Sequence, residues 1–316
     1  MKNKDNRDVS GVLILDKPPD MTSFDAVAKL RRIYGTRHIG HAGTLDPMAT
    51  GVLIVLIGSA AKAEEYLSHE KKSYEARLIL GQTSDTGDVT GAVRETGAPI
   101  PSADEVAAAA KELTGKLLQL PPMYSAIKIG GKKLVDLARK GIEVEREKRE
   151  ITVYSLEIEK IENSETGREY RLRCEVSGGT YIRTLITDLG EKLGCGAVMS
   201  ALRRTSAVGF DLSLAHRFDE LTDKTFEEAD RLLLPVERLF EDLQSVILPP
   251  FFEKLCRGGC PIYTRKLGEP AKALSPGDRV RLSGENGFFA VAHCAEVPAE
   301  KDENATETAL IADKKF

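Results

Sequence analysis

The order of apolar and polar residues predicts short strands alternating with helices in the first part of the chain. Residues 11–16 form an apolar run, GVLILD, that a lysine and two prolines close, which is typical of a buried strand. After it, Thr22 and Ser23 supply a helix N-cap and Gly35 a stop signal. The residues at helical spacing between these signals are Phe24, Val27, Leu30 and Tyr34. We therefore expect an amphipathic helix there.

Four later segments also predict strands. Residues 51–58 and 74–80 read GVLIVLIG and YEARLIL, and both are apolar enough for a buried strand. Residues 151–162 and 169–176 alternate polar and apolar positions, and the turn sequence NSETG separates them. We expect these two segments to form an antiparallel hairpin.

Helices are predicted in three further places. A capping-box pattern at residues 102–105 opens an alanine-rich helix, which Gly115 ends. The spacing of three leucines predicts a helix over residues 185–193, and residues 230–243, DRLLLPVERLFEDL, are also helical in pattern. Because helices are interspersed with antiparallel hairpins, the predicted fold class is α+β with a mixed, largely antiparallel sheet.

A change in composition near residues 240–250 predicts a domain boundary. Beyond it, short strand-like segments such as 278–284 and 287–294 are separated by Pro and Gly, which indicates a compact β-rich module. We expect a large domain over residues 9–243 and a small barrel over residues 244–316. The last dozen residues of the module are rich in Ala, Glu and Lys, and we expect them to be partly disordered.

Composition limits the expected location and cofactors. The chain has 316 residues, and neither a signal peptide nor an apolar stretch long enough for a membrane helix is evident, so we expect a cytoplasmic protein. Its five cysteines are then expected to be reduced thiols. Only Cys256 and Cys260 lie close together, and without a second pair or a nearby His they do not predict a zinc site.

Charge is distributed unevenly, although the formal net charge is only −4. The segment 128–150 carries eight Lys or Arg against five acids. Its basic residues are Lys128, Lys132, Lys133, Arg139, Lys140, Arg146, Lys148 and Arg149, and a second basic cluster consists of Arg31, Arg32, Arg37 and His38. Two interpretations remain open at this point: a basic face for phosphate groups, or ordinary solvated surfaces.

One loop carries a single acid among turn-forming residues. In GHAGTLDPMATG, residues 40–51, Asp46 precedes a proline, and three glycines allow a bulky ligand to approach the backbone. No Gly-Lys-Ser/Thr follows, so the loop is not a phosphate-binding P-loop. By composition alone a structural turn is the commoner interpretation of such a loop, and a catalytic acid is the alternative.

Five segments occur in a fixed order along the chain: GVLILDKPPDMTSFDAV, GHAGTLDPMATG, KSYEARLILGQTSDTGD, PPMYSAIKIGGKKLVDLARKG and GTYIRTLITDLGEKLGCGA. Together they resemble the TruB family of bacterial tRNA pseudouridine synthases from about Gly11 to Arg204. The resemblance implies the pseudouridine synthase fold for the large domain. The C-terminal module is similar to a PUA domain, a small RNA-binding barrel, up to about Val297.

The resemblance also implies an activity. It points to an isomerase that converts the uridine at position 55, in the T loop of tRNA, to pseudouridine without a cofactor or metal. Asp46 matches the family's essential aspartate. A carboxylate can attack the sugar or stabilise a cationic sugar, as in glycoside hydrolysis. Attack on the base and removal of a ribose proton are the other roles open to it, and the sequence does not select among them.

The target uridine lies inside a folded RNA loop, so the resemblance implies that it is extruded and held by stacking. Tyr74 matches the tyrosine that stacks on the base, and Leu202 matches an apolar wall of the uracil pocket. His41 matches the histidine that occupies the space left by the base. On local sequence alone, each of these three residues would be assigned to packing or to the surface.

The remaining matches concern support and closure of the site. Tyr181 and Arg183 match active-site residues, and Arg183 is expected to pair with Asp46 and orient it. Lys17 belongs to a motif that is expected to support the catalytic loop, with a direct contact to the substrate as the alternative. The basic segment 128–150 coincides with the family's mobile arm, which closes over the T loop with its glycines as hinges and its cations on phosphates.

Two other hypotheses remain on sequence alone. The chain could be an RNA-folding factor that binds and remodels the T loop, in which case Asp46 would be dispensable for its function. Base exchange, as in transglycosylases that share the PUA module, would change the mass of the RNA. For the synthase and for the folding factor the expected partner is the T stem-loop of tRNA. We expect a monomer with no obligate protein partner.

Overall fold

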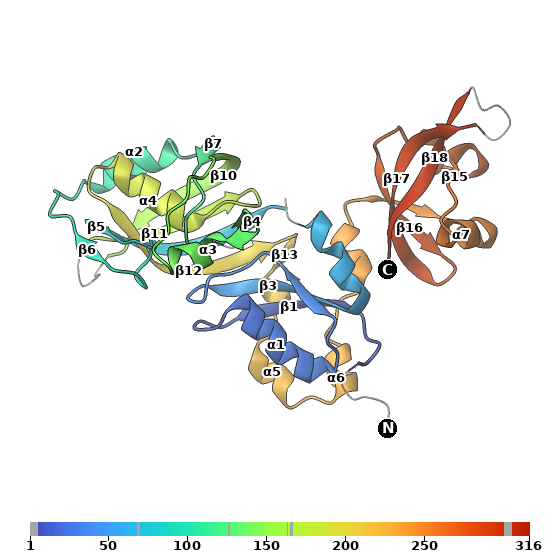
Figure 1. The fold of residues 1–316 in the computed structure, drawn as a ribbon, viewed down its shortest axis with the longest axis horizontal. Helices are drawn as coiled ribbons and strands as arrows, with labels where there is room; N and C mark the ends of the chain where they lie inside the picture. The colour runs from blue at the N-terminus through green and yellow to red at the C-terminus, as the bar shows by residue number, and fades with distance from the viewer. Residues whose placement is uncertain (1–5, 68–69, 126, 163, 165–166, 300–304) are drawn as a thin grey trace.

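A large mixed sheet forms the centre of the N-terminal part of the protein (Figure 1). The computed structural model describes residues 6–67, 70–125, 127–162, 164, 167–299 and 305–316. Within these ranges the sheet has nine strands. Its main path runs β1 (Gly11–Lys17), β3 (Thr50–Ile57), β12 (Ala197–Ala207), β4 (Lys72–Leu80), β11 (Glu169–Val176), β10 (Arg149–Lys160) and β7 (Gly115–Gln119). In addition, β2 (Ile39–Ala42) pairs with β3, and β13 (Phe210–Asp211) with β12.

Neighbouring strands on this path are antiparallel except β3 and β12, which are parallel. The predicted α+β class with a mixed, largely antiparallel sheet is confirmed. The predicted hairpin is present as β10 and β11, whereas most of the turn sequence between them lies outside the described residues.

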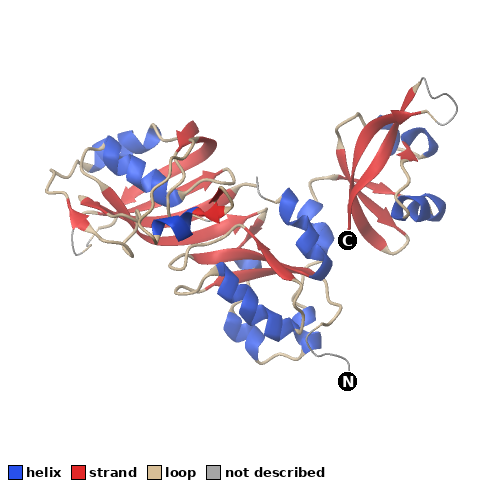
Figure 2. Cartoon of the chain, in the orientation of Figure 1, coloured by secondary structure: helices blue, strands red, loops and turns tan. Residues whose placement is uncertain are grey.

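Helices pack against the sheet in two separate places (Figure 2). In one, α2 (Ala103–Lys111) contacts β10 and α4 (Ile182–Lys192) contacts β12 and β4, and in the other α1 (Ser23–Tyr34) contacts β2. The shorter helical elements of this part are α3 (Leu134–Ala138), α5 (Phe218–Thr222), α6 (Phe226–Asp230), and the 3-10 turns η1 (Gly58–Tyr66), η2 (Leu212–Leu214) and η3 (Val236–Phe240). Two small hairpins are β5 (Gln82–Thr83) with β6 (Arg94–Glu95) and β8 (Lys128–Ile129) with β9 (Lys132–Lys133).

The first helix begins and ends where its sequence signals lie. The Thr22 hydroxyl accepts from the Asp25 N–H at 3.0 Å, the Asp25 carboxylate accepts from the Thr22 N–H at 3.1 Å, and Gly35 is left-handed with φ 60°. One prediction for this helix is wrong. Phe24 is 67% exposed, because the buried face is formed by other residues at helical spacing, among them Ala26 and Leu30.

One predicted helix ends earlier than expected, and another does not form as a single helix. α2 stops at Lys111, and Gly115, with φ 102°, begins β7 instead of ending the helix. Residues 230–243 do not form one helix either: α6 ends at Asp230 and a 3-10 turn starts after Pro235. Proline lacks a donor N–H and disfavours helix in the residue before it. Leu234 is accordingly extended and bridges to the edge strand β1.

The C-terminal module is built on a five-stranded sheet with the order β14 (Gln244–Ile247), β16 (Arg279–Gly284), β17 (Gly287–Pro298), β18 (Thr306–Lys315) and β15 (Ile262–Tyr263). α7 (Pro250–Arg257) and the 3-10 turns η4 (Thr264–Lys266) and η5 (Ala271–Ala273) accompany it. The expectation of partial disorder in the last dozen residues is wrong for residues 305–316. They include β18, which pairs with β17 and buries Ala309 and Leu310 completely.

The module contacts the large domain through aromatic side chains. Phe240 of η3 lies between 5.5 and 5.7 Å, centroid to centroid, from the rings of Tyr66, Phe288 and Phe316. An ion pair of 2.6 Å between Lys314 and a glutamate of η1 adds a polar contact at the same place. The end of the chain therefore packs against the large domain instead of extending into solvent.

Candidate active site

The loop that carries Asp46 connects β2 to β3 and is tied to α1. The Ala49 N–H closes a turn by donating to the Asp46 carbonyl at 3.0 Å. The Ser23 hydroxyl in the first turn of α1 accepts from the Leu45 N–H at 2.9 Å and donates to the Leu45 carbonyl at 3.3 Å. The residue before Asp46 is thus fixed by two hydrogen bonds.

Two of the three loop glycines serve the packing of the protein itself. Gly51 has φ 99°, and a Cβ there would lie 2.2 Å from the Arg204 carbonyl oxygen, so the position requires glycine. At Gly43, with φ 78°, a Cβ would lie 3.2 Å from a guanidinium nitrogen of Arg204 and 3.3 Å from Cε of Lys72. Only around Gly40 is there open space within 4 Å. Approach of a ligand is therefore not needed to explain Gly43 and Gly51.

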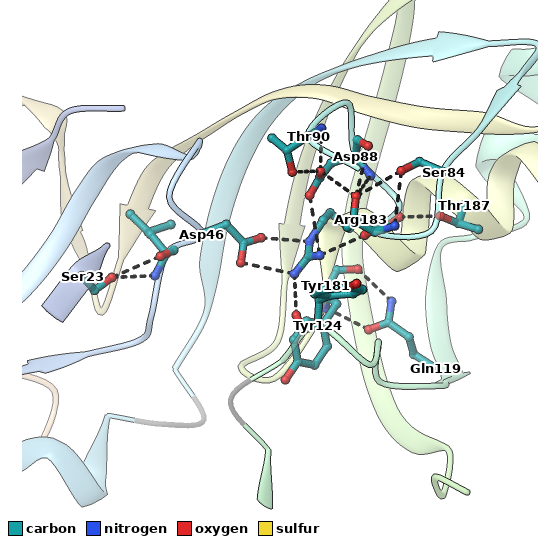
Figure 3. A network of polar contacts seen from close by, with 12 residues as sticks. Ser23, Asp46, Ser84, Asp88, Thr90, Gln119, Tyr124, Tyr181, Arg183 and Thr187 are labelled. Atoms are coloured by element: carbon teal, nitrogen blue, oxygen red, sulfur yellow. Dashed lines mark hydrogen bonds and ion pairs between the residues drawn. The ribbon is translucent and has the colours of Figure 1, made fainter. Parts of the chain in front are cut away.

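The carboxylate of Asp46 forms a two-point ion pair with Arg183, from the first turn of α4 (Figure 3). Nε lies 2.9 Å from Oδ2, and Nη2 donates to Oδ1 at 3.2 Å. The expected pairing of these two residues is present. A bidentate guanidinium contact fixes the orientation of a carboxylate as well as its position.

Arg183 is itself held by groups from two other segments (Figure 3). Nη1 donates to the Thr86 carbonyl at 2.9 Å, and Nη2 donates to the Tyr124 carbonyl at 2.8 Å. Nη1 also lies 3.6 Å from Oδ2 of Asp88, which is 4% exposed and accepts from the Thr90 N–H at 3.0 Å. Asp88 was not among the predicted site residues. Asp88 ends the segment GQTSDTGD, which is part of a motif that carries the resemblance, but no neighbouring residue indicates that it lies beside Arg183.

Burial and charge act on Asp46 in opposite directions. Burial raises the pKa of the Asp46 carboxyl above its ordinary value, and the Arg183 guanidinium opposes this rise. Asp88 adds to the rise, and Lys17 opposes it. The Asp46 side chain nevertheless keeps 35% of its surface exposed. The arrangement therefore presents a carboxylate that is oriented from one side and reachable from the other.

Asp46 faces a cavity of about 350 Å³. Six of the seven predicted site residues line it: Asp46, His41, Tyr74, Tyr181, Arg183 and Leu202. The seventh, Lys17, does not. Lining residues that were not predicted include Lys72, Tyr124 and Arg204. A cavity of this volume falls in the range of small-molecule sites.

Two neighbouring strands supply one wall of the cavity. Alternate residues of a strand face the same side, so Lys72 and Tyr74 on β4 are both buried there. β12 pairs with β4 in a register that sets Arg204 opposite Tyr74, and Leu202 lies two residues earlier on the same strand. The sequence pattern does not predict a strand at β12, so the assignment of Leu202 to the site rests on the resemblance alone.

Tyr181 is the N-cap residue of α4, and the side chain of Gln119 holds its backbone. The Tyr181 N–H donates to Gln119 Oε1 at 2.8 Å, and Gln119 Nε2 donates to the Tyr181 carbonyl at 3.1 Å. Burial raises the pKa of the Tyr181 phenol, so this group stays protonated at neutral pH. β7 therefore positions the start of α4, two residues before Arg183.

Lys17 lies beneath the loop and is completely buried. Its ammonium donates to the carbonyls of Pro18 at 2.8 Å, Met21 at 2.6 Å and Pro47 at 3.2 Å. Pro47 directly follows Asp46, so Lys17 joins the end of β1 to the loop that carries the acid. Burial lowers the pKa of Lys17 to about 8.

His41 lies on β2 at the edge of the cavity. Its Nδ1 is buried and has no hydrogen-bond partner among the described residues. Burial lowers the pKa of His41 below its ordinary value, and the positive charge of Arg204 lowers it further. The ring is therefore neutral at neutral pH, which suits stacking.

The described part of the chain contains no group of three or more His, Cys, Asp or Glu side chains arranged to hold a metal ion. The same residues include no helix that is both long enough and apolar enough to cross a membrane.

Comparison with known proteins agrees with the geometry. The model of the TruB family pseudouridylate synthase N-terminal domain matches residues 31–182, and that of the tRNA pseudouridylate synthase B C-terminal domain matches residues 183–241. The tRNA pseudouridine synthase B of Escherichia coli strain K12 is 41% identical over 294 residues, which cover 90% of this chain and 90% of that protein. The protein of the same name from Shigella flexneri serotype 5b has the same identity and coverage.

Solved structures of similar fold agree with these sequence matches. A chain in the crystal structure of a Cbf5-Nop10-Gar1 complex superimposes with a TM-score of 0.72 at 28% identity, covering 97% of this chain and 84% of that one. A chain in the structure of an H/ACA RNP bound to a substrate RNA containing 2′-deoxyuridine gives 0.70 at 26% identity, with the same coverage. The chain described here belongs to the TruB family of pseudouridylate synthases.

Proposed function

We propose that this protein isomerises the uridine at position 55, in the T loop of tRNA, to pseudouridine, with Asp46 as the catalytic residue. Family membership and the names of the relatives support the reaction and the substrate class. The observation that carries the assignment to Asp46 is its geometry. Its carboxylate is held at both oxygens by Arg183 and still faces a cavity large enough for a base.

The reaction rearranges bonds within one nucleotide. The bond from ribose C1′ to N1 of uracil breaks, the base turns, and C1′ bonds to C5, which releases its hydrogen as a proton while N1 gains one. No group is added or removed, so the isomerisation needs no redox cofactor. A fixed carboxylate suits it because it can bond to a reacting carbon, stabilise positive charge on the sugar, or accept a proton.

Extrusion of the uridine supplies the second part of the proposal. A base in a folded RNA loop must leave its stack before an enzyme can reach its sugar. Tyr74 and Leu202, each 8% exposed, offer an aromatic face and an apolar wall to a base in the cavity. The neutral ring of His41, at the edge of the same cavity, is placed to fill the gap in the RNA.

We assign contacts with the RNA outside the cavity to two further regions of the protein. In the basic arm, residues 128–150, the described side chains include six exposed cations: Lys128, Lys132, Arg139, Lys140, Lys148 and Arg149. We assign the phosphates of the T loop to this arm. We assign the rest of the tRNA to the PUA-like module, residues 244–316, with residues 9–243 as the catalytic domain. The protein is proposed to act as a monomer in the cytoplasm, without a protein partner.

The test replaces Asp46 by Asn and uses a T stem-loop RNA that carries tritium at C5 of the target uridine. We expect the purified wild type to release tritium and Asp46→Asn to release none while binding the RNA with similar affinity. Asp223→Asn, an exposed carboxylate at the end of α5, is the matched control and should behave as wild type.

One outcome would refute the role of Asp46, and two others would indicate a different function. Tritium release by Asp46→Asn would refute the catalytic assignment. A wild type that binds and refolds the RNA without releasing tritium would favour the RNA-folding factor. Base exchange would appear as a change in RNA mass, whereas pseudouridine has the same mass as uridine.

A further inference from the structure

Two buried cations that have no role in the proposed chemistry face the cavity. Lys72 is 7% exposed and Arg204 is completely buried, and both line the cavity. They come from adjacent strands, β4 and β12, and lie together behind Gly43 of the catalytic loop. The wall beside Asp46 therefore carries two positive charges in addition to Arg183.

Neither cation has a carboxylate partner among the described residues, where no acidic oxygen lies within 4.0 Å of them. Arg204 directs Nε to the Val52 carbonyl at 2.7 Å and Nη2 to the Gly43 carbonyl at 2.9 Å. Within the described ranges, the Lys72 ammonium donates a single long hydrogen bond, of 3.3 Å, to the Glu70 carbonyl. Two of its three donors are thus left for a ligand in the cavity.

The acids of the cavity are not placed to neutralise this pair. Asp46 is engaged by Arg183, and Glu64, the other lining acid, is exposed to solvent. A buried cation without a carboxylate in direct contact is costly, and burial lowers the pKa of Lys72 to about 8. Arg204 lowers this pKa further, whereas the Glu70 carboxylate raises it without coming within 4.0 Å of the Lys72 ammonium.

We propose that Lys72, supported by Arg204, binds a backbone phosphate of the RNA adjacent to the extruded nucleotide. This inference rests on the proposed function for the identity of the ligand. Phosphates are the anionic groups of RNA, and an extruded nucleotide carries one on each side into the mouth of the cavity. Lys72 and Tyr74 lie two residues apart on one face of β4, so one strand would hold both the phosphate and the base.

The experiment measures binding of the T stem-loop RNA in an Asp46→Asn background, where no turnover occurs. Lys72→Met removes the ammonium, and Lys72→Arg keeps a positive charge at the same place. Lys71→Met is the matched control, because the adjacent Lys71 is exposed and pairs with Glu175 at 2.9 Å outside the cavity. A set of RNAs in which one phosphate at a time is a neutral methylphosphonate then locates the contact.

We expect Lys72→Met to weaken binding by about tenfold at low salt, as for loss of one charge-assisted hydrogen bond. The slope of log affinity against log salt should fall by about 0.7 to 0.9, the value for one phosphate contact. One methylphosphonate beside the target should weaken binding by the parent and by Lys72→Arg but leave Lys72→Met unaffected. Lys72→Met should also unfold at a higher temperature than its parent, because an uncompensated buried charge has been removed.

Equal sensitivity of the parent and Lys72→Met to every methylphosphonate would overturn the proposal, as would unchanged affinity and salt dependence in Lys72→Met. A lower unfolding temperature in Lys72→Met with the phosphate pattern of the parent would assign Lys72 to structure alone. Since the readout is binding without turnover, these results are independent of whether Asp46 is the catalytic residue.

Discussion

Substitution of Arg183 separates the charge of this residue from its geometry. Arg183→Lys keeps a positive charge near Asp46 but loses the planar fork that contacts both carboxylate oxygens, at 2.9 and 3.2 Å. Arg183→Met loses both the fork and the charge. The two variants should therefore fail in different ways.

The magnitudes follow from these contacts. A hydrogen bond to a charged group contributes about 1.5 to 3 kcal/mol, and about 1.4 kcal/mol corresponds to tenfold in rate. Loss of one of the two contacts to Asp46 should lower kcat/KM of Arg183→Lys by about 10- to 150-fold. Arg183→Met also leaves Asp88, only 4% exposed, without its counter-charge. Removing one partner of a buried ion pair lowers the free energy of unfolding by roughly 3 to 5 kcal/mol. We expect a value near 3 kcal/mol for Arg183→Met because the Asp46 side chain is 35% exposed.

The pH dependence provides an independent check. If Asp46 reacts as a carboxylate, kcat/KM falls as the pH drops through its pKa. Arg183 opposes the rise in the pKa of Asp46 that burial causes, so Arg183→Met should move this acid limb to higher pH, and Arg183→Lys should leave it near that of wild type. Single-turnover tritium release across pH, with urea unfolding of each variant, measures both effects. A fully active Arg183→Lys, or a folded Arg183→Met with an unmoved acid limb, would refute the reasoning.

Two further predictions concern stability. Lys17→Met removes the donor to three carbonyls and should lower the free energy of unfolding by about 2 to 3 kcal/mol; an unchanged urea midpoint would contradict this. The pKa of Lys17 falls from 10.5 to about 8 on folding, so between these pH values the unfolded chain binds more protons and the contribution of Lys17 to stability rises with pH; the variant should lack this rise. Truncation after Ala305 removes β18 and should unfold the C-terminal sheet, detected by rapid proteolysis of the module, whereas a disordered tail could be removed without effect.

Local pattern accounts for much of the fold. The run at residues 11–16 became β1, and the signals at Thr22 and Gly35 mark the ends of α1. Such predictions succeed because burial of an apolar run and capping of a helix depend on residues only a few positions apart. They fail where a distant partner decides the outcome. The last residues form β18 because β17 offers a free edge, which their composition does not reveal.

For the candidate active site, too, some features follow from local sequence and others depend on the tertiary structure. The sequence by itself determined that one acid stands in a turn-rich loop, and its motifs indicated which residues would surround that acid. The resemblance also led us to expect that Arg183, 137 positions away, pairs with Asp46. Only the tertiary structure showed that Arg183 contacts both carboxylate oxygens and that Asp88 lies 3.6 Å from the same guanidinium. It also decided that Lys72 and Arg204 meet through the register of β4 and β12, with no carboxylate of the described residues within 4.0 Å of either. The physical reason is that contacts across a sheet depend on strand order and register, and neither is encoded in any single stretch of the chain.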